Sequence, residues 1–131
     1  MNVTADTNVI LRAIITDDVR QSNAARKALA ESEIVVVTTA ALCEAVWVMM
    51  RGYNHGHAAV AEAIRKLVSA TNVVTDQQSV EAGLAMLDAG GDFADGVIAL
   101  EGAAKGGATF LSFDKRAVKL LSQSGRAARL L

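Results

Sequence analysis

The stretch IVVVTTAALCEAVWVMMRG, residues 34–52, decides the fold class. Its β-branched start, Ile34–Val37, shows no polar alternation, which predicts a strand that is buried on both faces. Thr38 or Thr39 then caps an apolar helix over Ala40–Met50, and an arginine followed by a glycine ends that helix. A buried strand followed at once by a helix is the repeating unit of a parallel α/β sheet.

The same alternation of strands and helices extends along the whole chain. Further strands are expected at 2–5, 72–74, 108–112 and 127–131, and further helices at 7–12, 18–32, 57–70, 77–89, 92–105 and 115–123. Strands joined by helices pair in parallel, with the helices covering the faces of the sheet. We therefore expect a three-layer α/β fold with a small, mostly parallel sheet. No linker or repeat interrupts the pattern, so we expect one domain over residues 1–131.

Composition excludes several classes of protein. The net charge is −1 and 52% of the residues are hydrophobic, which excludes a disordered chain and a broad, metal-free electrostatic binder of nucleic acid. The single cysteine, Cys43, permits no intramolecular disulfide, and the segment Met1–Asp6 lacks the order of a signal peptide. The longest uncharged run, Ile34–Cys43, is too short to cross a bilayer. We expect a cytoplasmic protein with no membrane contact.

Acidic residues follow the ends of the expected strands. Asp6 follows the first strand, and Asp114 follows a strand near the C-terminus. Asp92 and Asp95 stand three residues apart at the start of a helix and therefore share one face of it. Sites in open parallel sheets form at the carboxyl ends of the strands. We expect these four acids and Glu44 to gather at one edge of the sheet.

Glu44 is the only charged residue between Glu33 and Arg51, in a helix that is apolar on nearly every side. Such a helix is expected to be buried, and a buried carboxylate needs a cation or a hydrogen-bond donor. The sequence leaves two partners open for Glu44: a metal ion, or an arginine such as Arg12.

The other acids also have two interpretations. Asp6, Asp92 and Asp114 each precede a helix, where an aspartate is a common N-cap. Asp95 lies one turn inside its helix, where no cap is needed. Carboxylates that converge repel one another unless cations neutralise them. Their hard oxygen atoms suit Mg²⁺ or Mn²⁺, and these ions activate water for attack on phosphate esters.

Four segments carry a family resemblance: DTNVILR at 6–12, Glu44 in its apolar helix, GDFADGVIA at 91–99, and SFDK at 112–115. In this order and spacing they resemble the PIN-domain ribonucleases over essentially the whole chain. The length and the opening segment most resemble the VapC-type toxins of type II toxin–antitoxin systems. One departure is Gly96, where relatives more often have alanine; the glycine is expected to loosen that helix start without removing an acid.

The resemblance implies a PIN-like fold and a Mg²⁺- or Mn²⁺-dependent endoribonuclease. Its substrate would be a structured RNA, such as tRNA or ribosomal RNA, so that cleavage inhibits translation. The resemblance also implies a homodimer and a cognate antitoxin protein whose tail covers the acidic site.

The family's functional residues carry over position by position. Four residues become the metal-binding, catalytic acids: Asp6, Glu44, Asp95 and Asp114. Three polar residues assist them, an accessory acid and two hydrogen-bonding partners of the acids or of a water on the metal: Asp92, Asn8 and Ser112. Three cations are expected to neutralise flanking RNA phosphates, with a solvated helix face as the other interpretation of the last two: Arg12, Lys115 and Arg116.

Other classes of function remain open from the sequence. A receiver or phosphohydrolase domain also gathers aspartates at strand ends, but it needs a lysine at a strand end and leaves Glu44 without a function. A PIN fold that binds RNA or serves as a scaffold without turnover would keep the same pattern. The segment His55-Gly56-His57 has the residues of a zinc site, yet no further histidine or neighbouring cysteine accompanies it.

Overall fold

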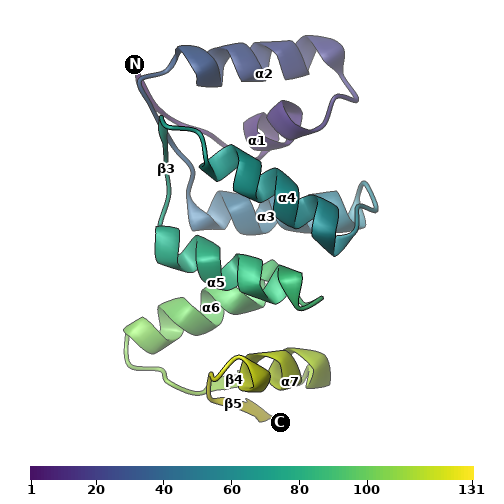
Figure 1. The fold of residues 1–131 in the computed structure, drawn as a ribbon, viewed down its shortest axis with the longest axis vertical. Coiled ribbons are helices and arrows are strands. Elements are labelled where there is room, and N and C mark those ends of the chain that lie inside the picture. Colours follow the sequence, from purple (N-terminus) through teal and green to yellow (C-terminus); the bar gives the residue numbers. More distant parts are fainter. The chain divides into compact units, whose positions relative to one another are not determined.

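The computed structural model describes all 131 residues and contains two compact units, Met1–Asp76 and Gln77–Leu131 (Figure 1). Each unit holds its own helices and its own small sheet, and every strand pair in both sheets is parallel. The predicted α/β class with a small parallel sheet and flanking helices is therefore confirmed. No helix combines the length and the apolar character needed to span a bilayer.

The first unit is built on a three-stranded sheet in the order β1-β2-β3. Its strands and helices are β1 Asn2–Thr4, α1 Thr7–Ile14, α2 Val19–Glu31, β2 Ile34–Val36, α3 Thr39–Arg51, α4 His57–Val68 and β3 Val73–Val74. Val35 occupies the centre of the sheet, because it pairs with Val3 on β1 and with Val73 on β3. The core around it consists of fully buried aliphatic side chains from the strands and helices: Ile10, Val37, Leu42 and Ile64.

Strand β2 differs from the prediction at its first residue. Val35 and Val37 are fully buried, whereas Val36 is half-buried and Ile34 is 39% exposed. Because consecutive strand residues point to opposite faces, one face of β2 is completely buried and the other only in part. The prediction of burial on both faces is wrong for Ile34. This residue belongs to the first pair of the ladder, opposite Asn2, where the sheet ends in solvent.

The helices begin where the capping residues predicted. The Asp18 carboxylate accepts a hydrogen bond from the Gln21 amide at 3.0 Å and starts α2. The Thr38 hydroxyl accepts one from the Ala41 amide at 3.2 Å and starts α3. Each cap satisfies a helix amide that has no partner within the helix, so the local sequence alone sets these boundaries.

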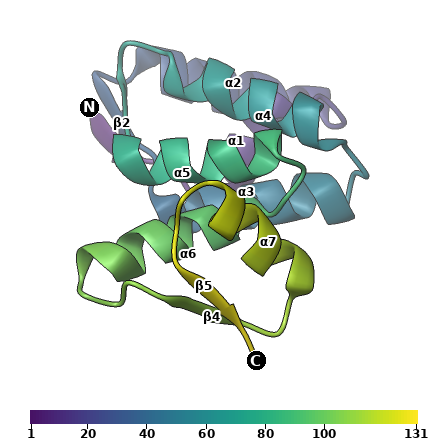
Figure 2. The ribbon, with the colours of Figure 1, turned by 60° about the horizontal axis from the view of Figure 1, so that its bottom comes forward.

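The second unit contains α5 Gln77–Asp88, α6 Phe93–Ala104, β4 Phe110–Ser112, α7 Lys115–Gln123 and β5 Ala128–Leu130. Figure 2 shows β4 and β5 side by side, with α7 connecting them and packing on both. The predicted bounds of α7 are confirmed. Met86, Ala99 and Leu121 form a buried cluster in this unit, covered by Phe110 and Leu120.

Two glycines allow α5 and α6 to pack closely. A Cβ atom on Gly83 would lie 2.5 Å from the ring of Phe93, which is fully buried. A Cβ atom on Gly96 would overlap the backbone carbonyl oxygen of Ala82 on α5. The missing side chain of Gly96 therefore lets the two helix backbones touch at this point, and the expectation that this glycine loosens its helix start stays a prediction.

A pair of glycine substitutions in α6 tests this packing. Gly96→Ala is expected to lower the free energy of unfolding by about 1–3 kcal/mol, because the added methyl group overpacks the contact with Ala82. Gly102→Ala lies in the same helix, with its nearest neighbour 3.8 Å from the added Cβ, and is expected to raise it by up to about 1 kcal/mol. Urea unfolding measures both. Stabilisation by both substitutions would show that helix propensity alone decides position 96.

Candidate active site

Asp6 lies two residues after Thr4, the last residue of β1, and begins α1. Its carboxylate Oδ1 accepts a hydrogen bond from the Val9 amide at 3.0 Å, and the side chain is exposed. Asn8 and Arg12 follow on the same helix. These three residues line one wall of a groove of about 410 Å³, and α2 supplies the other wall through Gln21 and three alanines. The polar residues of the opening segment DTNVILR therefore lie together at one groove of the first unit.

Arg12 is already engaged within the first unit. Its Nη1 atom donates to Oδ1 of Asp17 at 2.6 Å, and the Tyr53 hydroxyl donates to Oδ2 of the same carboxylate at 2.8 Å. The hydrogen bond from Tyr53, followed by that from Arg12, lowers the pKa of Asp17. The partner of Arg12 is thus Asp17 and not Glu44, so that interpretation of Glu44 is wrong. Nothing in the sequence indicated Tyr53, which lies 36 positions beyond Asp17.

Glu44 is exposed, contrary to the prediction of a helix buried on all sides. The buried face of α3 carries Leu42, Val46 and Met49 together with small residues. The opposite face carries Glu44 and Trp47, and the Trp47 side chain is 60% exposed. Apolar residues on the solvent side made the helix look buried in sequence. Glu44 is a hydrated carboxylate, so desolvation does not force a partner on it.

Asp92 and Asp114 act as helix caps in the second unit. Oδ1 of Asp92 accepts from the Ala94 amide at 3.1 Å and begins α6. Oδ1 of Asp114 accepts from the amides of Arg116 and Ala117 at 2.9 and 3.1 Å and begins α7. The N-cap interpretation of Asp6, Asp92 and Asp114 is therefore confirmed. In all three the cap uses Oδ1 alone, which leaves Oδ2 available to a cation.

Ser112 supports the acid that follows it. Its hydroxyl oxygen accepts a hydrogen bond from the Asp114 amide at 2.9 Å, at the point where β4 ends and the chain turns toward α7. This bond holds the backbone of Asp114 rather than its carboxylate. The predicted hydrogen bond from Ser112 to an acid side chain or to a water on the metal stays a prediction.

Asp95 carries the electrostatic signature of a cluster. Partial burial, followed by the negative charges of Asp92 and Asp114, raises its pKa from 3.8 to about 6. The second unit therefore brings three of the predicted acids close enough to repel one another. Asp6 and Glu44 belong to the first unit. No three acidic, histidine or cysteine side chains form a complete metal-binding group in the structure.

The donor set fits a hard divalent cation. Every candidate ligand is a carboxylate oxygen, the type that Mg²⁺ and Mn²⁺ prefer, and no soft sulfur ligand accompanies them. Burial is the main reason for the raised pKa of Asp95, and repulsion from Asp92 and Asp114 adds to it; a cation near these acids would relieve that repulsion. The residues of the second unit therefore suit such an ion in the type of their ligand atoms and in their charge, while the structure brings no three of them together as a complete metal-binding group.

The two predicted cations of α7 differ in their surroundings. The Lys115 side chain is exposed and has no side-chain partner. The Arg116 guanidinium donates through Nε and Nη2 to the carbonyl oxygen of Gly90, at 3.3 and 3.2 Å. Lys115 is thus free to meet an anion, whereas Arg116 already has an internal contact.

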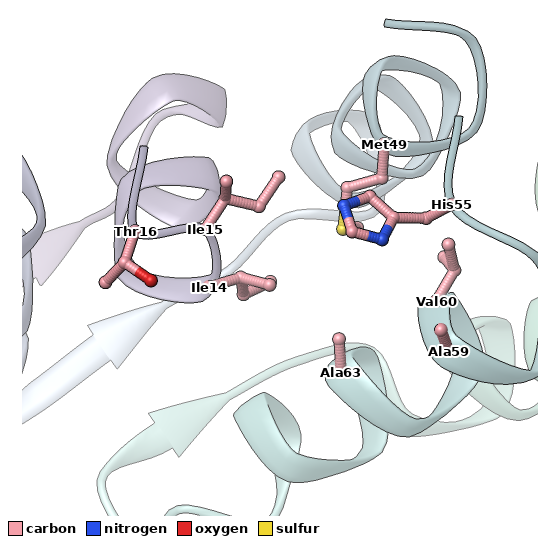
Figure 3. A pocket seen from close by; sticks show the side chains of 8 residues that line it. All are labelled: Ile14, Ile15, Thr16, Met49, His55, Ala59, Val60 and Ala63. Carbon is pink, nitrogen blue, oxygen red and sulfur yellow. The ribbon is translucent and has the colours of Figure 1, made fainter. Parts of the chain in front are cut away.

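His55 lines an apolar pocket rather than a cluster of metal ligands. The pocket has a volume of about 340 Å³, and its other walls include Ile14, Met49 and Val60 (Figure 3). The ring of Tyr53 lies 6.2 Å from the His55 ring, centroid to centroid. Hydrocarbon surroundings of this kind offer a cation no ligands.

Comparisons with known proteins give one family. The family model described as PIN domain matches residues 3–120, on both sides of the boundary between the two units. Among solved structures, the chain is similar to Mycobacterium tuberculosis VapC20, a sarcin-ricin loop cleaving toxin. The sequence identity is 19%, the match covers 96% of this chain and 97% of that chain, and the TM-score is 0.46. No curated protein matches the chain.

Removing the Asp95 charge is expected to stabilise the metal-free protein at pH 7. The folded protein holds this proton more tightly than the unfolded chain, since the pKa is about 6 against 3.8. The resulting stabilisation is present below pH 4 and is lost as the pH rises through 6, where the folded state must carry the charge. Because water screens a partly exposed group, we expect Asp95→Asn to add about 1 kcal/mol at pH 7.

Urea unfolding in EDTA at pH 7 and pH 4 measures this effect, and the gain should vanish at pH 4. Asp18→Asn is the matched control, because it removes a capping charge in the first unit while asparagine keeps the cap. An Asp95→Asn gain of equal size at both pH values would contradict the electrostatic explanation.

Proposed function

The chain belongs to the PIN domain family, and from this premise we propose that it is a Mg²⁺- or Mn²⁺-dependent endoribonuclease. Family membership supports a nuclease activity in general. The observation that supports the metal-dependent form is the acidic cluster of the second unit, in which partial burial, followed by the charges of Asp92 and Asp114, raises the pKa of Asp95. Such repulsion is typical of carboxylates that share a cation.

Four acids would hold the metal and carry the reaction: Asp6, Glu44, Asp95 and Asp114. Asp92 would be an accessory acid, placed by its cap at the start of the helix that carries Asp95. Ser112 would orient Asp114 through its backbone amide. Asn8, on the wall of the Asp6 groove, would hydrogen-bond the acids or a water of the site.

A bound divalent cation supplies two things to phosphodiester hydrolysis: it lowers the pKa of a water molecule and offsets the negative charge that develops on the phosphate. The chain's own residues prepare this chemistry. The caps of Asp6 and Asp114 use Oδ1 and leave Oδ2 free. Asp95 must be ionised to serve as a ligand, so we expect the affinity for the cation to fall as the pH drops through about 6.

The substrate and partners follow from the resemblance to VapC-type toxins. We propose a structured RNA substrate, tRNA or ribosomal RNA, whose cleavage inhibits translation in the cytoplasm. Lys115 offers an unpaired ammonium to the RNA phosphates, and Arg12 and Arg116 keep guanidinium donors that their internal bonds do not use. We further propose a homodimer and an antitoxin protein that blocks the acidic site.

Both units are proposed to work as a single nuclease domain over residues 1–131. The family match supports this, because it continues across the boundary after Asp76. The acids also divide between the units, with Asp6 and Glu44 in the first and the other acids in the second.

Conservative substitutions of capping acids test this assignment. Asp6→Asn and Asp114→Asn each keep a residue that caps helices well but remove the charge that a cation needs. We expect each to lower Mn²⁺-dependent RNA cleavage at least about 100-fold, the scale on which the loss of one electrostatic contact slows an enzyme. The fold should persist in both, whereas Asp6→Ala would also lose the cap.

Cleavage is measured by sequencing RNA ends after incubation with total RNA and Mn²⁺, with EDTA as the metal-free arm. Asp18→Asn serves as the control, because this cap lies outside the proposed site and its loss of charge should leave cleavage unchanged. Full activity of Asp6→Asn, or cleavage that persists in EDTA, would refute the proposed mechanism. RNA binding without any cleavage would favour a binding or scaffold module instead.

A further inference from the structure

Arg116 makes two contacts that join separate parts of the second unit. Its backbone amide donates to Oδ1 of Asp114 at 2.9 Å, as part of the cap of α7. Its guanidinium donates through Nε and Nη2 to the carbonyl oxygen of Gly90, 26 positions earlier in the chain. One residue therefore connects the acid at the start of α7 with the turn that closes α5.

That turn leads directly to the other acids of the cluster. Gly90 has a φ of +84°, a conformation that glycine adopts without strain, and the Gly91 amide donates to the Met86 carbonyl at 2.7 Å. Asp92 follows and begins α6, which carries Asp95 one turn later. The position of the turn thus determines where α6 begins and where its two acids lie.

Helix α7 contacts this turn at a second point. A Cβ atom on Gly91 would lie 2.7 Å from Cδ1 of Leu120, which stands one helical turn after Arg116. Leu120 belongs to the apolar side of α7 that packs on the buried cluster of the second unit. The apolar contact holds the helix against the turn, but hydrophobic contacts are non-directional and do not fix how the helix is oriented there. The two guanidinium hydrogen bonds are directional, because a planar group that donates from two nitrogens holds its acceptor in one orientation.

We propose that Arg116 is a positioning residue that sets the spacing of Asp114 from Asp92 and Asp95 by tying the start of α7 to the Gly90-Gly91 turn. This inference rests on the proposed function, since the spacing matters for a metal ion shared by these acids. Two of the five guanidinium N–H donors are used in this way. The exposed Lys115, which has no side-chain partner, is the better placed of the two neighbours to bind RNA phosphate.

A substitution of Arg116 changes the metal affinity in opposite directions, depending on whether Arg116 positions the acids or acts only through its charge. Removing a positive charge beside an acidic cluster strengthens the binding of a cation by Coulomb attraction. Losing the hydrogen bonds from Arg116 to Gly90 allows the carboxylates to separate, and this weakens the binding of the cation. Arg116→Gln is therefore expected to weaken Mn²⁺ binding by about tenfold, the usual effect of removing a group that orients metal ligands.

Two further variants complete the test. Lys119→Gln removes one positive charge from the exposed side of the same helix, where Lys119 has no partner, and is expected to leave Mn²⁺ affinity unchanged or slightly raised. Arg116→Lys keeps the charge but cannot donate from two fixed nitrogens. It is expected to weaken Mn²⁺ binding nearly as much as Arg116→Gln, because geometry and not charge is lost.

The experiment is a calorimetric titration of Mn²⁺ into each full-length variant without RNA. Amide hydrogen exchange at Gly91 is recorded in EDTA, and thermal unfolding checks that the variants are folded. Weaker Mn²⁺ binding and faster Gly91 exchange in both Arg116 variants, but not in Lys119→Gln, would support the inference. Unchanged or tighter Mn²⁺ binding in Arg116→Gln would overturn it. A wild-type chain that binds no Mn²⁺ would refute the proposed function instead.

Discussion

Carboxylates that cap helices are the interaction on which the rest of this structure depends. At Asp6, Asp92 and Asp114, a single side chain ends a loop or strand and satisfies the first amides of the next helix. Each cap is worth about 1 kcal/mol and uses one carboxylate oxygen. The cap does not use the second oxygen, and all three side chains are exposed. The fold therefore places acids at its helix starts for reasons of stability, and a cation site can use the same residues.

Electrostatic repulsion is the opposing constraint. Asp95 needs no cap partner and lies partly buried beside two other acids, so its charge destabilises the metal-free fold at neutral pH. The protein tolerates this because α5 and α6 pack closely through Gly83 and Gly96 and hold the helix in place. A structure that carries an unfavourable charge on a rigid element is typical of sites that await a ligand.

The internal contacts of the arginines show how the same residue type can serve two purposes. Arg12 closes a small network with Asp17 and Tyr53 in the first unit, and Arg116 reaches the Gly90 carbonyl in the second. Both were expected from sequence to meet RNA phosphates. In the structure their guanidinium groups make hydrogen bonds within the protein, and these bonds fix the orientation of the N–H donors that remain unused. Lys115 is exposed and has no side-chain partner, as expected of a cation that is free to meet RNA phosphates.

Signals that act within four residues were readable from the sequence, and so was the family pattern. The caps at Asp18, Thr38, Asp92 and Asp114, the bounds of α7 and the parallel pairing all follow from local propensity and from the order of strands and helices. The acids of the candidate site were named from their positions in that order. The joint action of Asp6, Glu44, Asp95 and Asp114 stays a prediction.

Only the tertiary structure decided which side chains meet and which face water. It exposes Glu44 to solvent and places Arg12 beside Asp17, which also accepts a hydrogen bond from Tyr53. It also brings Arg116 to the Gly90 carbonyl and raises the pKa of Asp95. Hydrophobic periodicity cannot separate a buried helix from one that exposes alanine and tryptophan, as α3 does. Long-range hydrogen bonds leave no periodic trace either. Their partners, 26 and 36 positions apart, come together only after the helices have packed.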